Sequence, residues 1–116
     1  MSEREAFGQR INKFQALRHR FVDLHAQMEL CKHYNYGVVA MLDKGEYAVK
    51  EATISKLKST KMADQVAYNC LQFLGGYGYI EDYPMARMLR DSRLGPIGGG
   101  TSEILREIIA LSLIHI

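Results

Sequence analysis

The amino-acid sequence predicts an all-α protein, an up-down four-helix bundle with two long and two shorter helices. Apolar residues recur at alternating spacings of three and four, the repeat of a helix that buries one side. Glycine and proline are concentrated in a few short stretches, which delimit the helices. No stretch shows the apolar–polar alternation of a half-buried strand. Residues 1–116 are therefore expected to form a single helical domain.

The first long helix is expected from Phe14 to about Lys44. Gly37 is the expected position of any kink, and Gly45 supplies the left-handed residue that commonly follows a helix. The buried seam of this helix is expected to consist of Phe14, Leu17, Phe21, Leu24, Met28 and Cys31.

The second long helix is expected from Tyr47 to Leu74, and the short turn before it makes the pair an antiparallel hairpin. Lysine, serine and threonine fill residues 50–61, which indicates one exposed side there. In the second half of this helix, apolar residues again recur at spacings of three and four. Its buried seam is expected to include Ala63, Val66, Cys70 and Phe73.

Two shorter helices follow. One is expected from Pro84 to about Arg93, because proline is favoured at the first helical position, and the other from Thr101 onward. Long helices of about 45 Å, at ~1.5 Å per residue, are larger than two short helices can cover. We therefore expect the domain to pack against another domain or another copy.

Composition excludes several classes of protein. The hydrophobic fraction is 47% and the net charge is only +2, which argues against a nucleic-acid partner. The longest apolar run, residues 104–116, is too short and too often interrupted to span a membrane. The N-terminal residues do not resemble a signal peptide.

Cysteine and histidine do not indicate a metal site or a disulfide. Cys31 and Cys70 both fall in helical apolar patterns, so we interpret them as buried, reduced thiols of an intracellular protein. No histidine has metal-ligand spacing with cysteine or acidic partners, and no metal is expected.

Two glycine-rich stretches are the candidate functional segments. In residues 95–103, GPIGGGTSE, backbone N–H groups ahead of a helix could approach a phosphate or a carbonyl group. The alternative is a plain turn capped by Gly100 or Thr101, with Glu103 in the first helical turn. Residues 72–79, QFLGGYGY, lack the strand–turn–helix context of a dinucleotide fingerprint and could be a helix stop.

The order of several short motifs is more specific than any one of them. Arg-x-x-Phe-Gly at residues 4–8 is followed by Gln15, then by Gln-x-x-Gly-Gly-x-Gly-Tyr at residues 72–79. Tyr-Pro at 83–84, Arg-Asp at 90–91 and Gly-Thr-Ser-Glu-Ile at 100–104 complete the series. This series, across residues 3–110, strongly resembles the C-terminal helical domain of the acyl-CoA dehydrogenases.

The resemblance implies a function for the whole protein. Acyl-CoA dehydrogenases desaturate acyl-CoA thioesters between the α and β carbons: a carboxylate removes the α proton and a hydride passes to FAD. They form dimers or tetramers with FAD at subunit contacts, and electron-transferring flavoprotein is the usual acceptor. A member would be cytoplasmic in a bacterium or in the mitochondrial matrix of a eukaryote. This domain alone is expected to be inactive.

The resemblance also implies roles for individual residues. The residues that match FAD contacts are Arg4, at the diphosphate and across a subunit boundary, Phe7, Gln15, Gln72, Gly75, Gly76, Thr101 and Glu103. Gly100 matches a residue that borders the acyl thioester. The pair Arg90-Asp91 is interpreted as structural.

The sequence departs from the family at one position. Many members carry the catalytic glutamate directly before Gly-Thr, and here Gly99 occupies that position. The isovaleryl and long-chain branches place their glutamate on an upstream helix, so we expect the base outside this chain. The alternative is a non-catalytic helical assembly module that has lost the chemistry. Residues 111–116 also depart from the family and could be non-native.

Overall fold

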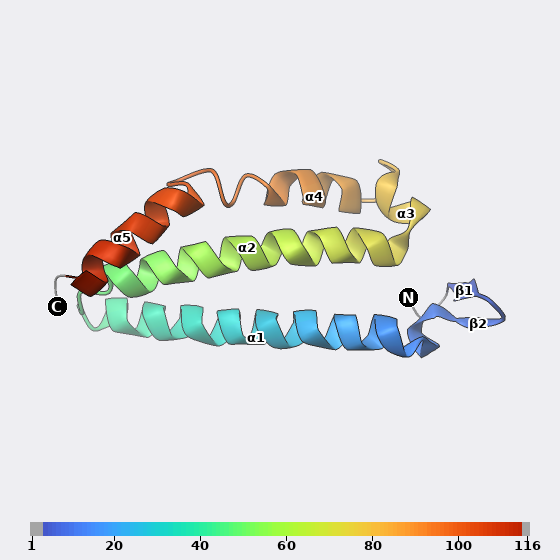
Figure 1. Ribbon diagram of the computed structural model, residues 1–116, viewed down its shortest axis with the longest axis horizontal. Helices are drawn as coiled ribbons and strands as arrows, with labels where there is room; N and C mark the ends of the chain where they lie inside the picture. The colour runs from blue at the N-terminus through green and yellow to red at the C-terminus, as the bar shows by residue number, and fades with distance from the viewer. Residues whose placement is uncertain (1–3, 115–116) are drawn as a thin grey trace.

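The computed structural model describes residues 4–114 (Figure 1). It begins with a two-stranded antiparallel hairpin and a short 3-10 helix and continues with helices. The elements are β1 (Glu5–Ala6), β2 (Gln9–Arg10), η1 (Ile11–Lys13), α1 (Gln15–Asp43), α2 (Val49–Leu74), α3 (Gly76–Tyr79), α4 (Met85–Ser92) and α5 (Ser102–Ile114).

The all-α class and all four predicted helices are confirmed, with bounds shifted by one or two residues. Three features were not predicted. They are the hairpin of β1 and β2, in which Ala6 pairs with Gln9, the 3-10 helix η1, and α3, a single turn that forms the second half of residues 72–79.

The predicted stop at Gly45 is confirmed in detail. Gly45 has φ +74°, and its N–H donates to the carbonyl of Leu42 at 2.9 Å. The N–H of Glu46 donates to the carbonyl of Met41 at 3.1 Å. This pair of hydrogen bonds is a Schellman motif, which satisfies carbonyls that the helix end would otherwise leave unpaired. α1 runs through Gly37 as one helix.

The helices are arranged around α2. In Figure 1, α2 lies between α1 on one side and α4 with α5 on the other. α4 and α5 follow one another along α2, so the helices form three layers instead of closing around one common axis. The core is correspondingly small. Its buried apolar residues are Ile11, Val38, Ala48, Met62, Ala67, Phe73, Met85, Ala86 and Leu105.

Polar side chains join α1 to α2, which corrects one expectation. Residues 50–61 do not present a uniformly exposed polar side. Asn35 of α1 donates to the hydroxyl of Ser59 at 3.0 Å and accepts from the hydroxyl of Ser55 at 2.5 Å. Thr53 is buried and donates to the carbonyl of Val49. A serine or threonine hydroxyl can be satisfied inside a helix pair, so its polarity does not by itself indicate exposure.

The predicted apolar seam of α1 is only partly covered. Phe21 is 51% exposed and Met28 is 42% exposed, because α1 packs against α2 on one side only. The two cysteines are free thiols, as expected, but they are half-buried and not buried. Burial raises the pKa of the Cys70 thiol. Both thiols border a groove of about 790 Å³ between α1, α2 and α4.

The domain is thin and extended. Its principal extents are 59 × 25 × 25 Å and its radius of gyration is 17.8 Å, against about 13 Å for a compact domain of 100 residues. Its accessible surface of 8426 Å² exceeds the roughly 6,400 Å² expected of a compact monomer of this mass. Within residues 4–114, no helix combines the length and apolarity needed to cross a bilayer.

Candidate functional site

Residues 95–100, from the stretch GPIGGGTSE, form an ordered loop between α4 and α5, which we call the glycine loop. The backbone carbonyl of Leu94 accepts hydrogen bonds from the N–H groups of Ile97 and Gly98, at 3.0 and 2.7 Å. Gly99 and Gly100 then adopt φ values of +62° and +96°, in the left-handed region that favours glycine. The loop is therefore a sequence of tight turns whose last two residues require glycine.

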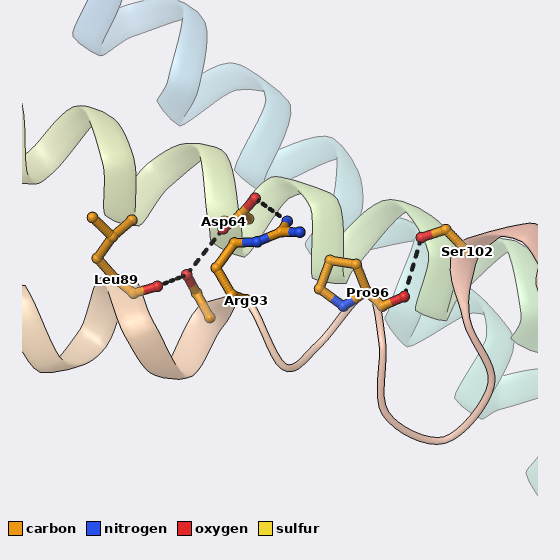
Figure 2. Close-up of polar contacts among 6 residues, drawn as sticks. Asp64, Leu89, Arg93, Pro96 and Ser102 are labelled. Carbon is orange, nitrogen blue, oxygen red and sulfur yellow. Dashed lines mark hydrogen bonds and ion pairs between the residues drawn. The ribbon is translucent and has the colours of Figure 1, made fainter.

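Hydrogen bonds fix both ends of this loop (Figure 2). At the α4 end, Asp64 of α2 accepts from the hydroxyl of Ser92 at 3.2 Å and from the guanidinium of Arg93 at 2.9 Å. At the α5 end, the Pro96 carbonyl accepts from the hydroxyl of Ser102 at 3.4 Å and from its N–H at 3.0 Å. The Asp64 contacts hold the start of the loop against α2, and the Ser102 contacts close the loop on itself.

The middle of the loop rests on a lysine of α2. The ammonium group of Lys56 donates to the carbonyls of Gly98 at 2.6 Å, of Gly99 at 2.9 Å and of Gly100. Sequence reasoning missed Lys56 because it lies in the lysine-, serine- and threonine-rich segment that was expected to face solvent. No local pattern distinguishes it from the exposed Lys58 two residues later.

The start of α5 agrees with both interpretations of GPIGGGTSE. The Thr101 hydroxyl accepts from the N–H of Ile104 at 3.4 Å, as an N-cap does. A hydrogen bond from its own backbone N–H, with smaller contributions from Arg106 and Thr101, lowers the pKa of the exposed Glu103 carboxyl. Glu103 is therefore a carboxylate that is satisfied by its own helix.

The glycine-rich stretch at residues 72–79 meets Arg4. The guanidinium of Arg4 donates to the carbonyl of Leu74 at 3.1 Å, and a Cβ atom placed on Gly75 would collide with that guanidinium. Gly75 also has φ +61°, so the backbone conformation favours glycine, whereas the exposed Arg4 side chain could move aside for a Cβ atom. Arg4 and Gly76 line a cavity together with Tyr77 and Ile80, which sequence reasoning did not identify.

Arg4 has no carboxylate partner among residues 4–114. An arginine without an ion pair in this part of the chain, beside a glycine bend, is suited to a phosphate-bearing group. The structure thus brings Arg4, Gly75 and Gly76 together, and we call this group the arginine cluster.

Phe7 lies at the tip of the β1–β2 hairpin. It is 97% exposed and has φ +53°, an uncommon conformation for a bulky residue. Its ring contacts only the edge of Phe14 among the aromatic side chains, with centroids 6.4 Å apart. Gln15 and Gln72 are also exposed, and the Gln15 amide lies 3.3 Å from the His19 ring.

The candidate residues form two separate groups. The arginine cluster lies at the C-terminal end of α2, whereas the glycine loop rests on Lys56 near its N-terminal end. Nineteen residues separate Lys56 from Gly75, which corresponds to roughly 30 Å along a helix. Gly99, Gly100, Thr101 and Glu103 therefore do not meet Arg4, Gly75 and Gly76 within one chain.

The chemistry of these groups is that of binding. Within residues 4–114, no three histidine, cysteine or acidic side chains gather where they could hold a metal ion. Gly99 cannot accept a proton, and Glu103 is a weak base because its pKa is lowered. The glycine loop instead offers backbone N–H groups, and the arginine cluster offers a cation.

Comparison with known proteins shows close relatives. Residues 1–114 match the family model described as acyl-CoA dehydrogenase, C-terminal domain. Mitochondrial isovaleryl-CoA dehydrogenase of Bos taurus is 43% identical over 106 residues, which are 91% of this chain and 25% of that protein. The chain thus spans about a quarter of the length of this relative.

Solved structures agree. The crystal structure of an acyl-CoA dehydrogenase from Geobacillus kaustophilus superposes with a TM-score of 0.94 and 35% identity, covering 97% of this chain and 30% of that one. An FAD complex of PigA superposes with a TM-score of 0.91 and 29% identity, covering 97% and 29%.

Proposed function

The chain belongs to the acyl-CoA dehydrogenase family as a C-terminal domain, and from this premise we propose that it supplies FAD-binding residues to an enzyme that desaturates acyl-CoA thioesters. FAD, when bound, would accept the hydride from the β carbon. The residues of this domain would bind and orient the cofactor and the thioester, while the proton acceptor lies outside the chain.

The arginine cluster is the observation that carries the proposal. Among residues 4–114, the cluster combines a guanidinium without a carboxylate partner and a glycine bend directly beside that guanidinium. Both features fit the diphosphate of FAD, which requires a cation and close approach to the backbone. We propose that Arg4 binds the diphosphate and that Gln72, Gly75 and Gly76 border the same half of the cofactor.

Phe7 supports the same assignment. A phenylalanine in a strained conformation, with almost all of its surface in water, is unfavourable for the isolated chain. A contact that covers the ring would offset this cost. We propose that Phe7 and Gln15 contact FAD from the hairpin end of α1, and that Thr101 and Glu103 contact FAD from the glycine loop, where Gly100 borders the acyl thioester.

The two groups suit a cofactor shared between copies. A separation of roughly 30 Å, in a chain whose surface is about 2,000 Å² larger than a compact monomer needs, favours completion of each site by a second copy. We propose a homodimer or homotetramer. Electron-transferring flavoprotein is proposed as the acceptor, and the compartment as the bacterial cytoplasm or the mitochondrial matrix.

The test is flavin binding and reduction by the intact protein, meaning this chain within the polypeptide of its source gene. We expect a yellow, FAD-containing oligomer whose flavin absorbance bleaches when branched or short acyl-CoA is added anaerobically. An intact protein that is colourless and does not take up added FAD would refute the proposal.

The 116-residue chain alone is the matched control, and we expect no flavin reduction from it. A non-catalytic assembly module is the second candidate, favoured by Gly99 at the position of the base. It predicts an intact oligomer that binds no flavin and oxidises no acyl-CoA.

A further inference from the structure

Lys56 makes an unusual contact. Its ammonium group, reaching from the second turn of α2, donates to three consecutive carbonyls of a loop that is more than forty positions away in sequence. An ammonium group has three N–H donors, and here each has an acceptor from Gly98, Gly99 or Gly100. No carboxylate pairs with Lys56 among the described residues.

This contact fixes the direction of three N–H groups. In a trans peptide the C=O and the N–H of the next residue point in opposite directions, and the described chain contains no cis peptide. Because the three carbonyls point toward Lys56, the N–H groups of Gly99, Gly100 and Thr101 point away from it. None of these three N–H groups has an acceptor among residues 4–114.

The lysine also changes the strength of these donors. The positive charge of Lys56 is not paired with a carboxylate among the described residues and lies directly on carbonyl oxygens. It therefore polarises these peptide groups, and their N–H groups become better donors. The outward direction of these N–H groups and their polarisation both favour a hydrogen bond to an oxygen acceptor on the outer side of the loop.

We propose that Lys56 is a positioning residue for the acyl thioester. It gathers the three glycine carbonyls and so turns the following N–H groups outward, where that of Gly99 or Gly100 can donate to the thioester oxygen. This inference rests on the proposed function, since it is that proposal which assigns the loop to the acyl-CoA side. Lys56 itself touches neither cofactor nor substrate.

The first experiment measures the loop directly. Hydrogen–deuterium exchange of the peptide spanning residues 96–102 is compared among wild type, Lys56→Met and Lys58→Met. The N–H groups of Ile97, Gly98 and Ser102 are hydrogen-bonded within the loop, and we expect them to lose protection in Lys56→Met only. Lys58 is exposed on the same helix and makes no contact with the loop, so its variant is the matched control.

The second experiment measures the reaction of the intact protein. We expect Lys56→Met to lower kcat about tenfold, less than the hundredfold or more that follows removal of a direct oxyanion donor. The FAD content and the KM for acyl-CoA should stay within about twofold of wild type, because Lys56 acts on N–H direction and not on uniform binding. Lys56→Arg keeps the charge but presents a planar donor set, so we expect partial rescue.

The outcomes separate this inference from the proposed function. A wild-type protein without flavin would refute the proposed function and with it the assignment to the thioester. Wild-type activity with unchanged exchange and unchanged kcat in Lys56→Met would overturn the role of Lys56 alone. Loss of FAD from the variant would also overturn it, since the loop would then be positioned for the cofactor. A fall in kcat with retained FAD and KM, together with loosened exchange, would support it.

Discussion

At the scale of single residues, the two candidate groups depend on backbone conformations that few side chains tolerate. Phe7 is the exception, because it occupies a positive φ without being glycine. With Gly8 at φ +79°, it forms a two-residue turn with positive φ at both central positions, a turn that prefers Asn-Gly. Phenylalanine at position 7 therefore lowers the free energy of unfolding of the isolated chain relative to asparagine.

Phe7→Asn should consequently stabilise the isolated chain and weaken the cofactor site. We expect the free energy of unfolding to rise by about 0.5–1 kcal/mol, since asparagine tolerates positive φ and no apolar ring remains in water. Urea denaturation measures the first effect, and FAD titration of the intact protein measures the second. A variant that is less stable, or that binds FAD as tightly as wild type, would contradict the assignment.

Gly75 and Gly76 are adjacent but should respond differently to the same substitution. In Gly75→Ala, φ +61° becomes strained and the Arg4 guanidinium is displaced from its contact with Leu74, so we expect a loss of about 1–2 kcal/mol. Gly76 has no atom within 4 Å of its virtual Cβ and lies in α3, so Gly76→Ala should be neutral or slightly stabilising. Thermal unfolding of the pair checks this, and equal destabilisation would argue against the arrangement of the arginine cluster.

At the scale of elements, ion pairs join segments that the helical pattern leaves unconnected. Arg90 of α4 pairs with Glu81 of the preceding loop at 2.7 Å. The Arg90 guanidinium, by its hydrogen bond and its charge, lowers the pKa of the Glu81 carboxyl, and Glu81 raises the pKa of Arg90. The ion pair with Glu81 supports the interpretation of Arg90 as a structural residue. Asp91 forms no ion pair among the described residues.

The Glu81–Arg90 pair should give a stabilisation that depends on pH. Because the folded-state pKa of Glu81 is below its unfolded value of about 4.3, the stabilisation is present above that pH and is lost as pH falls through the folded-state pKa. Glu81→Gln should therefore melt slightly below wild type at pH 7 and together with it in strong acid. The difference should shrink in salt, because both side chains are exposed. A difference that persisted in strong acid would exclude this cause.

The sequence was sufficient to predict the helices, but not how the candidate residues group in space. Three-four spacing and the glycines at 45 and 75 determine the long helices almost to the residue, because these signals are local. The hairpin at residues 5–10 was missed because its strands are two residues long, too short to show alternation. Lys56 was missed because its partners lie over forty positions away, and a helix surface pattern carries no information about such contacts.

At the scale of the whole molecule, the domain leaves much of α1 uncovered. Its large exposed apolar side chains are Phe21, Val22, Met28, Leu30, Tyr34, Tyr36, Val39 and Leu42. Stable protein interfaces bury about 1,200–2,000 Å² in total, or roughly 800 Å² of each partner. The excess of about 2,000 Å² over a compact monomer is larger than this share, which agrees with the predicted packing against another copy or domain.

Placing a charge in this surface should weaken self-association. Leu30 is 72% exposed on α1, and Leu30→Glu should raise the dissociation constant of the oligomer at least about tenfold if the side chain becomes buried there. Leu30→Met keeps the apolar character and should associate as wild type does. Sedimentation equilibrium distinguishes the variants, and identical association of all three would remove Leu30 from the interface.

The continuity of α2 restricts how this domain can change its length. One helix carries Lys56 near one end and leads directly to Gly75 at the other. Removing a single residue between them would shift one group by about 1.5 Å and rotate it by roughly 100° about the helix axis. A deletion would therefore misalign the glycine loop and the arginine cluster relative to each other even if every contact within each survived. Insertions and deletions are consequently expected in the connections at either end of α2, while its span stays constant.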